Sequence, residues 1–172
     1  MSKDFAHRLA LDRIRDGDRV DLVADEAECA AIAKRLGLAS LDRLEAHAVI
    51  ASKGEQVRAT GRVKASLAQY CVASNEPVPE RIDECFELLF LPEPKGRPDD
   101  EVELGAQELD VIFHDGAGIE LGAAIADTLA LSLDPYPRGP KADEALKAAG
   151  VLNEEQAGPF AALAKLKGKK AE

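Results

Sequence analysis

Cations recur at alternate positions in residues 56–69, a run with the period-two pattern of a strand. Because side chains alternate between the two faces of a strand, these cations should project together from one face. A basic strip of this kind could follow a phosphate backbone, and its members are candidate RNA-binding residues. The alternative is an ordinary solvated face, on which they pair with Glu84 or Glu87 of a neighbouring strand. The cations are Arg58, Arg62 and Lys64, and Thr60 and Ser66 share their face.

Residues that could hold a metal or act as nucleophiles are scattered along the chain. The three histidines and three cysteines have no C-x2-C or H-x3-H spacing, which argues against a metal site. The chain contains no G-x-S-x-G, G-x-x-x-x-G-K-[ST] or G-x-G-x-x-G motif. Metal-dependent turnover of RNA, built on His114 and scattered carboxylates, is the one catalytic alternative. We therefore expect a protein that is not an enzyme and uses no metal, cofactor or small-molecule substrate.

A second candidate surface is the proline-rich stretch LSLDPYPRGP at residues 131–140. Its three prolines fix their backbone φ angles near −65° and lack N–H donors, so an extended polyproline II segment is expected. This stiff segment carries Tyr136, a candidate contact for a protein partner, and Arg138, a further candidate RNA contact. The alternative is that the segment only ends a helix and packs back on the body of the protein.

The net charge of −10 is concentrated in one part of the chain. Residues 76–108 hold eleven acids against three cations. This excess argues against simple wrapping of nucleic acid, where Lys and Arg neutralise phosphates, and favours a basic partner. Candidate contacts for a basic protein are Asp99, Asp100, Glu101 and Glu103.

The elements that would position these residues begin with a short strand at residues 5–11 and a turn at RDGD. Asp25 and Glu28 have capping-box spacing, and apolar residues at helical spacing then run to Leu36 before Gly37. Residues 44–50 and 57–67 alternate on either side of SKGEQ, which predicts a long antiparallel hairpin. Gly61 in its second strand suggests a bulge or sharp bend, and a sheet that curls.

Further along, residues 82–91 and 109–113 read as strands and residues 121–131 as a helix. Pro159 suits the first position of a short C-terminal helix. We predict an α+β fold with a curled, partial-barrel-like antiparallel sheet, two main helices and this short C-terminal helix. Residues 1–150 would form one domain, with an acidic, Pro-rich loop at about 91–105, and residues 151–172 the C-terminal helix and basic tail.

The pattern of apolar residues bears on localisation. No apolar run approaches the roughly 18 residues of a membrane helix, and the N-terminal residues lack the apolar core of a signal peptide. The odd number of cysteines, without close pairs, suits a reducing compartment. We expect a cytoplasmic protein without membrane association.

Four segments in order carry a family resemblance: ADEAECAAIAKRLGLASLDRLEAHAVI (24–50), GRVKASLAQYCVASNEPVPERIDECFELLFLP (61–92), IELGAAIADTLALSLDPYPR (119–138) and PFAALAKLK (159–167). Together they resemble the YceD family, the large ribosomal RNA subunit accumulation proteins, in its alphaproteobacterial form. Many relatives have a C-x-R-C-L cysteine pair where this chain keeps only Cys71. This departure argues against a metal or redox role here.

The resemblance implies a non-enzymatic, cytoplasmic role in the synthesis, processing or stability of 23S rRNA, and hence in large-subunit biogenesis. The partner would be 23S rRNA or its precursor, a basic large-subunit ribosomal protein, or both. Direct RNA contact would use the cations of the strip and Arg138. In the alternative, the protein is an acidic adaptor or holdase that binds a basic ribosomal protein without touching RNA.

Overall fold

The computed structural model describes residues 5–94 and 110–151, which divide between two compact units. Unit 1 comprises Met1–Gln69 and Pro79–Pro135, and unit 2 comprises Tyr70–Val78 and Tyr136–Glu172. The predicted C-terminal helix at Pro159 and most of the acidic loop lie outside the described residues.

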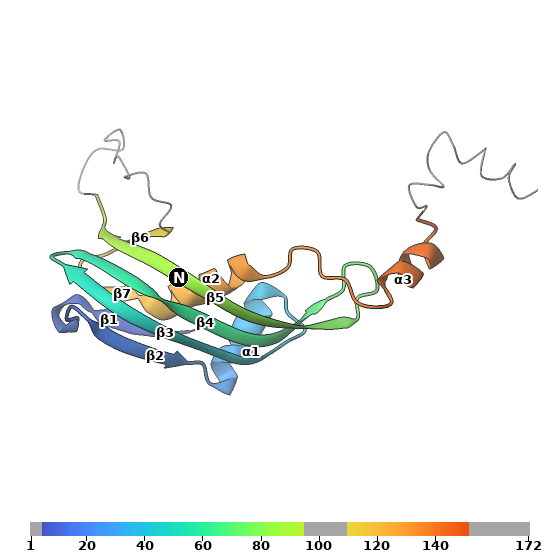
Figure 1. Ribbon diagram of the computed structural model, residues 1–172, viewed down its shortest axis with the longest axis horizontal. Coiled ribbons are helices and arrows are strands. Elements are labelled where there is room, and N and C mark those ends of the chain that lie inside the picture. Colours follow the sequence, from blue (N-terminus) through green and yellow to red (C-terminus); the bar gives the residue numbers. More distant parts are fainter. Residues whose placement is uncertain (1–4, 95–109, 152–172) are drawn as a thin grey trace, which may run out of the picture. The chain divides into compact units, whose positions relative to one another are not determined.

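A five-stranded sheet in the order β2-β3-β4-β5-β6 lies in unit 1, except for Tyr70, Pro77 and Val78 at the ends of β4 and β5, which belong to unit 2 (Figure 1). The strands are β2 (Asp18–Val23), β3 (Ser40–Lys53), β4 (Gln56–Tyr70), β5 (Pro77–Pro92) and β6 (Asp110–His114). β3 and β4 form the predicted antiparallel hairpin, closed at Lys53 opposite Gln56. β2 was not predicted, although Val20 and Leu22 alternate with polar neighbours along it.

Two predictions about this sheet are wrong. β6 runs parallel to β5, with Leu88 opposite Asp110 and Pro92 opposite His114, so the sheet is mixed and not antiparallel throughout. The alternating pattern specifies which face a residue occupies but not the direction of its neighbour. The sheet is also open, with β2 and β6 at its edges, and it is neither closed nor strongly curled (Figure 1).

Gly61 does not mark a bulge. The pairing of β3 with β4 is continuous from Arg43 to Lys53, with Ala48 opposite Gly61, and a register shift lies just before Arg43. A Cβ atom on residue 61 would lie 1.9 Å from the carbonyl oxygen of His47. Glycine is needed here because the two backbones approach too closely for any side chain.

Two helices cover one face of the sheet (Figure 1): α1 (Glu26–Leu36) and α2 (Leu121–Ser132). The predicted capping box of α1 is present, since the Asp25 carboxylate accepts the Glu28 N–H at 2.8 Å and the Glu28 carboxylate accepts the Asp25 N–H at 3.0 Å. The largest fully buried side chains of unit 1 belong to one core cluster: Phe5, Leu22, Ile32, Leu44, Ile50, Leu67, Leu88, Phe90, Ile119, Leu121, Ile125 and Leu129.

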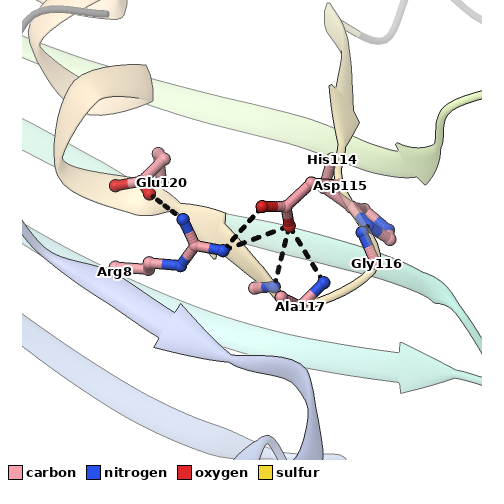
Figure 2. Close-up of polar contacts among 7 residues, drawn as sticks. Arg8, His114, Asp115, Gly116, Ala117 and Glu120 are labelled. Atoms are coloured by element: carbon pink, nitrogen blue, oxygen red, sulfur yellow. Dashed lines mark hydrogen bonds and ion pairs between the residues drawn. The ribbon is translucent and has the colours of Figure 1, made fainter.

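The N-terminal strand is shorter than predicted. β1 (Arg8–Ala10) pairs antiparallel with β7 (Gly118–Glu120), and a 3-10 helix, η1 (Leu11–Arg13), follows it. Arg8 links this strand pair to the turn just before β7. Its guanidinium lies 2.8 Å from Asp115 in that turn and 2.9 Å from Glu120 in β7 (Figure 2). The hydrogen bond from Arg8, supported by backbone N–H groups, lowers the pKa of Asp115 to about 2.

Unit 2 is described for residues 70–78 and 136–151 and contains α3 (Ala142–Ala148), which was not predicted. Its two segments are held together by backbone hydrogen bonds: the Val72 N–H donates to the Pro137 carbonyl at 2.9 Å, and the Gly139 N–H donates to Cys71 Sγ at 3.4 Å. With further donors from Ser74, the Gly139 bond lowers the pKa of the buried Cys71 thiol to about 6.

Among the helices in the described ranges, none is both long and apolar enough to cross a membrane.

Candidate nucleic-acid interface

The cations of β4 project from the open face of the sheet, opposite the helices. Inward residues of β4 such as Val57, Val63 and Ala65 are buried, whereas the residues between them are half-buried or exposed. The structure therefore places Arg58, Arg62 and Lys64 on one face, through the alternation of a regular strand.

Two of these cations form ion pairs with β5. Arg58 lies 2.8 Å from Glu87, and Arg62 bonds to Asp83, a partner that the sequence analysis did not name. The bond to Asp83 raises the pKa of the Arg62 guanidinium further above its usual value. All four side chains are close to half-exposed, so the pairs lie in solvent-screened surroundings. Any phosphate that reached Arg58 or Arg62 would compete with a carboxylate already bound there.

Acidic groups also flank β4 on its other side. His47 of β3 lies directly opposite Arg62, and its Nδ1 is 2.6 Å from Asp21 of β2. A row Asp21–His47–Arg62–Asp83 thus crosses four strands, with a carboxylate at each end. The face of the sheet is a network of paired charges around β4 and not a uniformly basic strip.

Lys64 is the exception among the three cations. Its neighbour in β3 is Glu45, which accepts instead from Arg43 at 2.6 Å. Alternation along β5 places Arg81, two residues before Asp83, on the same face as the carboxylates that bind Arg58 and Arg62. Within residues 5–94 and 110–151, neither Lys64 nor Arg81 has an ion-pair partner, and both are exposed. Each of the two neighbouring strands therefore presents one such cation on this face.

The remaining predicted contacts lie in unit 2 or outside the described residues. Tyr136 and Arg138 are both exposed, and Arg138 lies 2.7 Å from Asp143. The four acidic candidates, Asp99, Asp100, Glu101 and Glu103, fall in the part of the chain that the structure does not describe.

The catalytic alternative on His114 finds no support in the geometry. His114 is buried, its Nε2 lies 2.8 Å from the Glu55 carbonyl oxygen, and its Nδ1 accepts the Gly116 N–H at 3.1 Å. Because both ring nitrogens are engaged, His114 supports the turn before β7 (Figure 2) and has no nitrogen directed at a ligand. Across the described ranges, His, Cys, Asp and Glu residues nowhere form a group of three or more that could hold a metal ion.

Sequence reasoning missed three residues that define this face: Arg81, Asp83 and His47. The signal for the first two was available, because they alternate with the apolar Ile82 along β5. Their pairing with β4 depends on register, which a turn as irregular as the one between β4 and β5 does not fix from sequence.

The chain matches the model of a protein family. No curated protein and no solved structure matches the chain. The model of one family, described as large ribosomal RNA subunit accumulation protein YceD, matches residues 59–167. The match includes most of β4 and everything from β5 to α3, and it spans more than half of the 172 residues. The chain therefore belongs to the YceD family of large ribosomal RNA subunit accumulation proteins.

Proposed function

We propose that this protein is a non-enzymatic factor that supports the synthesis, processing or stability of 23S rRNA by direct contact with the RNA or its precursor. The family description, a role in large ribosomal RNA subunit accumulation, supports the pathway. A cytoplasmic location and a 23S precursor as partner follow from the same proposal.

The observation that carries direct contact is the pair of cations Lys64 and Arg81 without carboxylate partners in the described ranges. Like charges on one face of neighbouring strands repel each other. A phosphate bound between them would remove this repulsion, so the site favours an anion. Arg58 and Arg62 would contribute less, because each must first leave Glu87 or Asp83.

A crosslinked pull-down from growing cells tests the proposal, with RNA and protein recovered from the same sample. We expect enrichment of 23S precursor at defined positions, and its loss in a Lys64→Ala/Arg81→Ala variant. The matched control is Arg13→Ala/Arg19→Ala, which likewise removes two exposed cations from the unit without touching the pair. Equal loss in both variants would mean that total charge, and not this site, determines recovery.

A second pair of variants tests the competition with carboxylates. Asp83→Asn and Glu87→Gln free Arg62 and Arg58 while keeping the shape of the side chains. If RNA follows this face, the double variant should bind a 23S fragment more tightly than the wild type, and its affinity should fall more steeply with salt. Unchanged affinity and salt dependence would place the RNA elsewhere.

The acidic adaptor is the second candidate, and the net charge of −10 favours it. It predicts that the pull-down recovers a basic large-subunit ribosomal protein without short-range RNA crosslinks. Recovery should then fall when Asp99, Asp100, Glu101 and Glu103 are all changed to their amides.

A further inference from the structure

The exposed tyrosines of this protein are concentrated in unit 2. The chain has two tyrosines and no tryptophan, and both tyrosines, Tyr70 and Tyr136, belong to that unit. Their exposed fractions are 46% and 74%. In unit 1, Phe5, Phe86 and Phe90 are buried in the core, and Phe113 at the sheet edge is 48% exposed. In a chain with so few aromatics, two exposed rings in one small unit call for an explanation.

The segment that carries Tyr136 is anchored on alternate residues. Pro137 is buried and accepts the Val72 N–H, and Gly139 donates its N–H to Cys71 Sγ. Space for a side chain at Gly139 is tight, since a Cβ there would lie 3.3 Å from a methyl group of Val78. Tyr136 and Arg138, which alternate with these anchors, are exposed. The prolines and these contacts hold the two outward side chains on an already ordered backbone, which lowers the entropy cost of binding.

The second tyrosine is near one of these contacts in the sequence. Tyr70 is two residues before Val72, and Tyr136 is one residue before Pro137, so each tyrosine is within two residues of a partner in the Val72–Pro137 hydrogen bond. Arg138 and Lys141 follow on the same segment, and each pairs with an exposed carboxylate, Arg138 with Asp143 and Lys141 with Glu76.

Charge separates this unit from the rest of the chain. Unit 2 has seven Lys and Arg residues and six Asp and Glu residues. Unit 1 has fifteen Lys and Arg residues and twenty-six Asp and Glu residues. The excess negative charge of the protein therefore belongs to unit 1. A polyanion meets no net repulsion from unit 2 itself.

We propose that unit 2 binds unpaired RNA, with bases stacked on Tyr70 and Tyr136 and a phosphate held by Arg138. The proposal rests on the proposed function and names the form of RNA that the protein takes. Stacking on exposed rings tolerates any base sequence and requires bases that are free of a duplex. Arg138 would exchange the exposed Asp143 carboxylate for a phosphate oxygen.

Fluorescence anisotropy with the full chain and labelled 12-nucleotide oligouridylate tests this directly. We expect Tyr136→Ala and Tyr70→Ala each to weaken binding by about 5- to 150-fold, the range found for loss of one stacked base. Tyr136→Phe keeps the ring and should stay within about twofold of the wild type. Arg138→Ala should reduce the slope of log affinity against log salt by about 0.7. A duplex of the same length should bind more weakly than the single strand.

The matched control is Val72→Ala, which removes an exposed apolar side chain of unit 2 that cannot stack. Wild-type affinity in both Tyr→Ala variants, with circular dichroism unchanged, would overturn this inference and leave RNA contact to unit 1. Equal affinity for duplex and single strand would also overturn it. Failure of the wild type to bind any RNA would instead remove direct contact from the proposed function.

Tyrosine emission supplies a second readout, because the two tyrosines of the chain report on unit 2 alone. Oligouridylate should quench this emission after correction for absorbance by the RNA. In Tyr70→Phe only Tyr136 emits, so residual quenching assigns stacking to that ring. Binding without quenching would contradict stacking even if affinity were high.

Discussion

Gly61→Ala is a sharp test of the β3–β4 hairpin that carries the candidate interface. The added Cβ would start 1.9 Å from the carbonyl oxygen of His47, whereas contacts below 3.0 Å are essentially never seen, so the strands must separate locally by about 1.1 Å. Overpacking in a well-packed region costs about 1–3 kcal/mol, and this contact is with backbone, which places it near the upper end. The lower chain entropy of alanine returns about 0.5 kcal/mol. We therefore expect a loss of about 2–3 kcal/mol in the free energy of unfolding.

Urea unfolding followed by circular dichroism measures this loss. With a slope of about 2 kcal/mol per molar urea, the midpoint should fall by roughly 1–1.5 M. The control is Gly54→Ala at the tip of the same hairpin, where nothing lies within 4 Å and only the positive φ of 64° opposes a side chain. That change should cost about 1 kcal/mol. If Gly61→Ala were no more destabilising than Gly54→Ala, the close approach of β3 and β4 would be refuted.

Three further predictions follow from single groups. In a variant that keeps no other cysteine, thiolate absorbance at 240 nm should titrate Cys71 near pH 6 in the folded protein and near 8.5 in urea. Because the thiolate is the favoured form, the stability it contributes is complete above the unfolded pKa and is lost as the pH falls through about 6. Asp115→Asn should lower the urea midpoint at neutral pH, and the difference from wild type should vanish as the pH falls from about 4 to about 2. A pH-independent difference would rule out the ion pair with Arg8 as its cause. Asp25→Ala should cost about 1 kcal/mol by removing the cap of α1, measured by urea unfolding, and a loss below about 0.3 kcal/mol would contradict the capping box.

Local signals predicted the local elements well. The residues of the capping box identified the start of α1, and strict alternation identified β3 and β4 with their turn. The parallel pairing of β6 was not accessible, because it depends on contacts distant in sequence and on no turn chemistry. The bulge predicted at Gly61 is absent for a similar reason. From sequence alone, a glycine that is needed because another backbone lies close cannot be distinguished from a glycine that is needed for a bend.

At the candidate interface too, features local to one strand were predicted and features that depend on a distant strand were not. The alternation of side chains along a strand correctly placed Arg58, Arg62 and Lys64 on one face, because this alternation depends only on the strand itself. Whether each cation has a carboxylate partner depends on how β5 aligns with β4. Within the described ranges, Arg58 and Arg62 form ion pairs with β5 and Lys64 forms none. In unit 2, the exposure of Tyr136 follows from the anchoring of Pro137, which composition does not reveal.

The pairing of β1 with β7 also delays the folding of the N-terminal residues during synthesis. Arg8 and Leu9 find their partners only when Glu120 and Ile119 have been made, roughly a hundred residues later. At about 5–20 residues per second this delay is on the order of 5–20 s. The hairpin of β3 and β4 can close early, but β1 has no strand partner and stays open to chaperones and proteases throughout that interval.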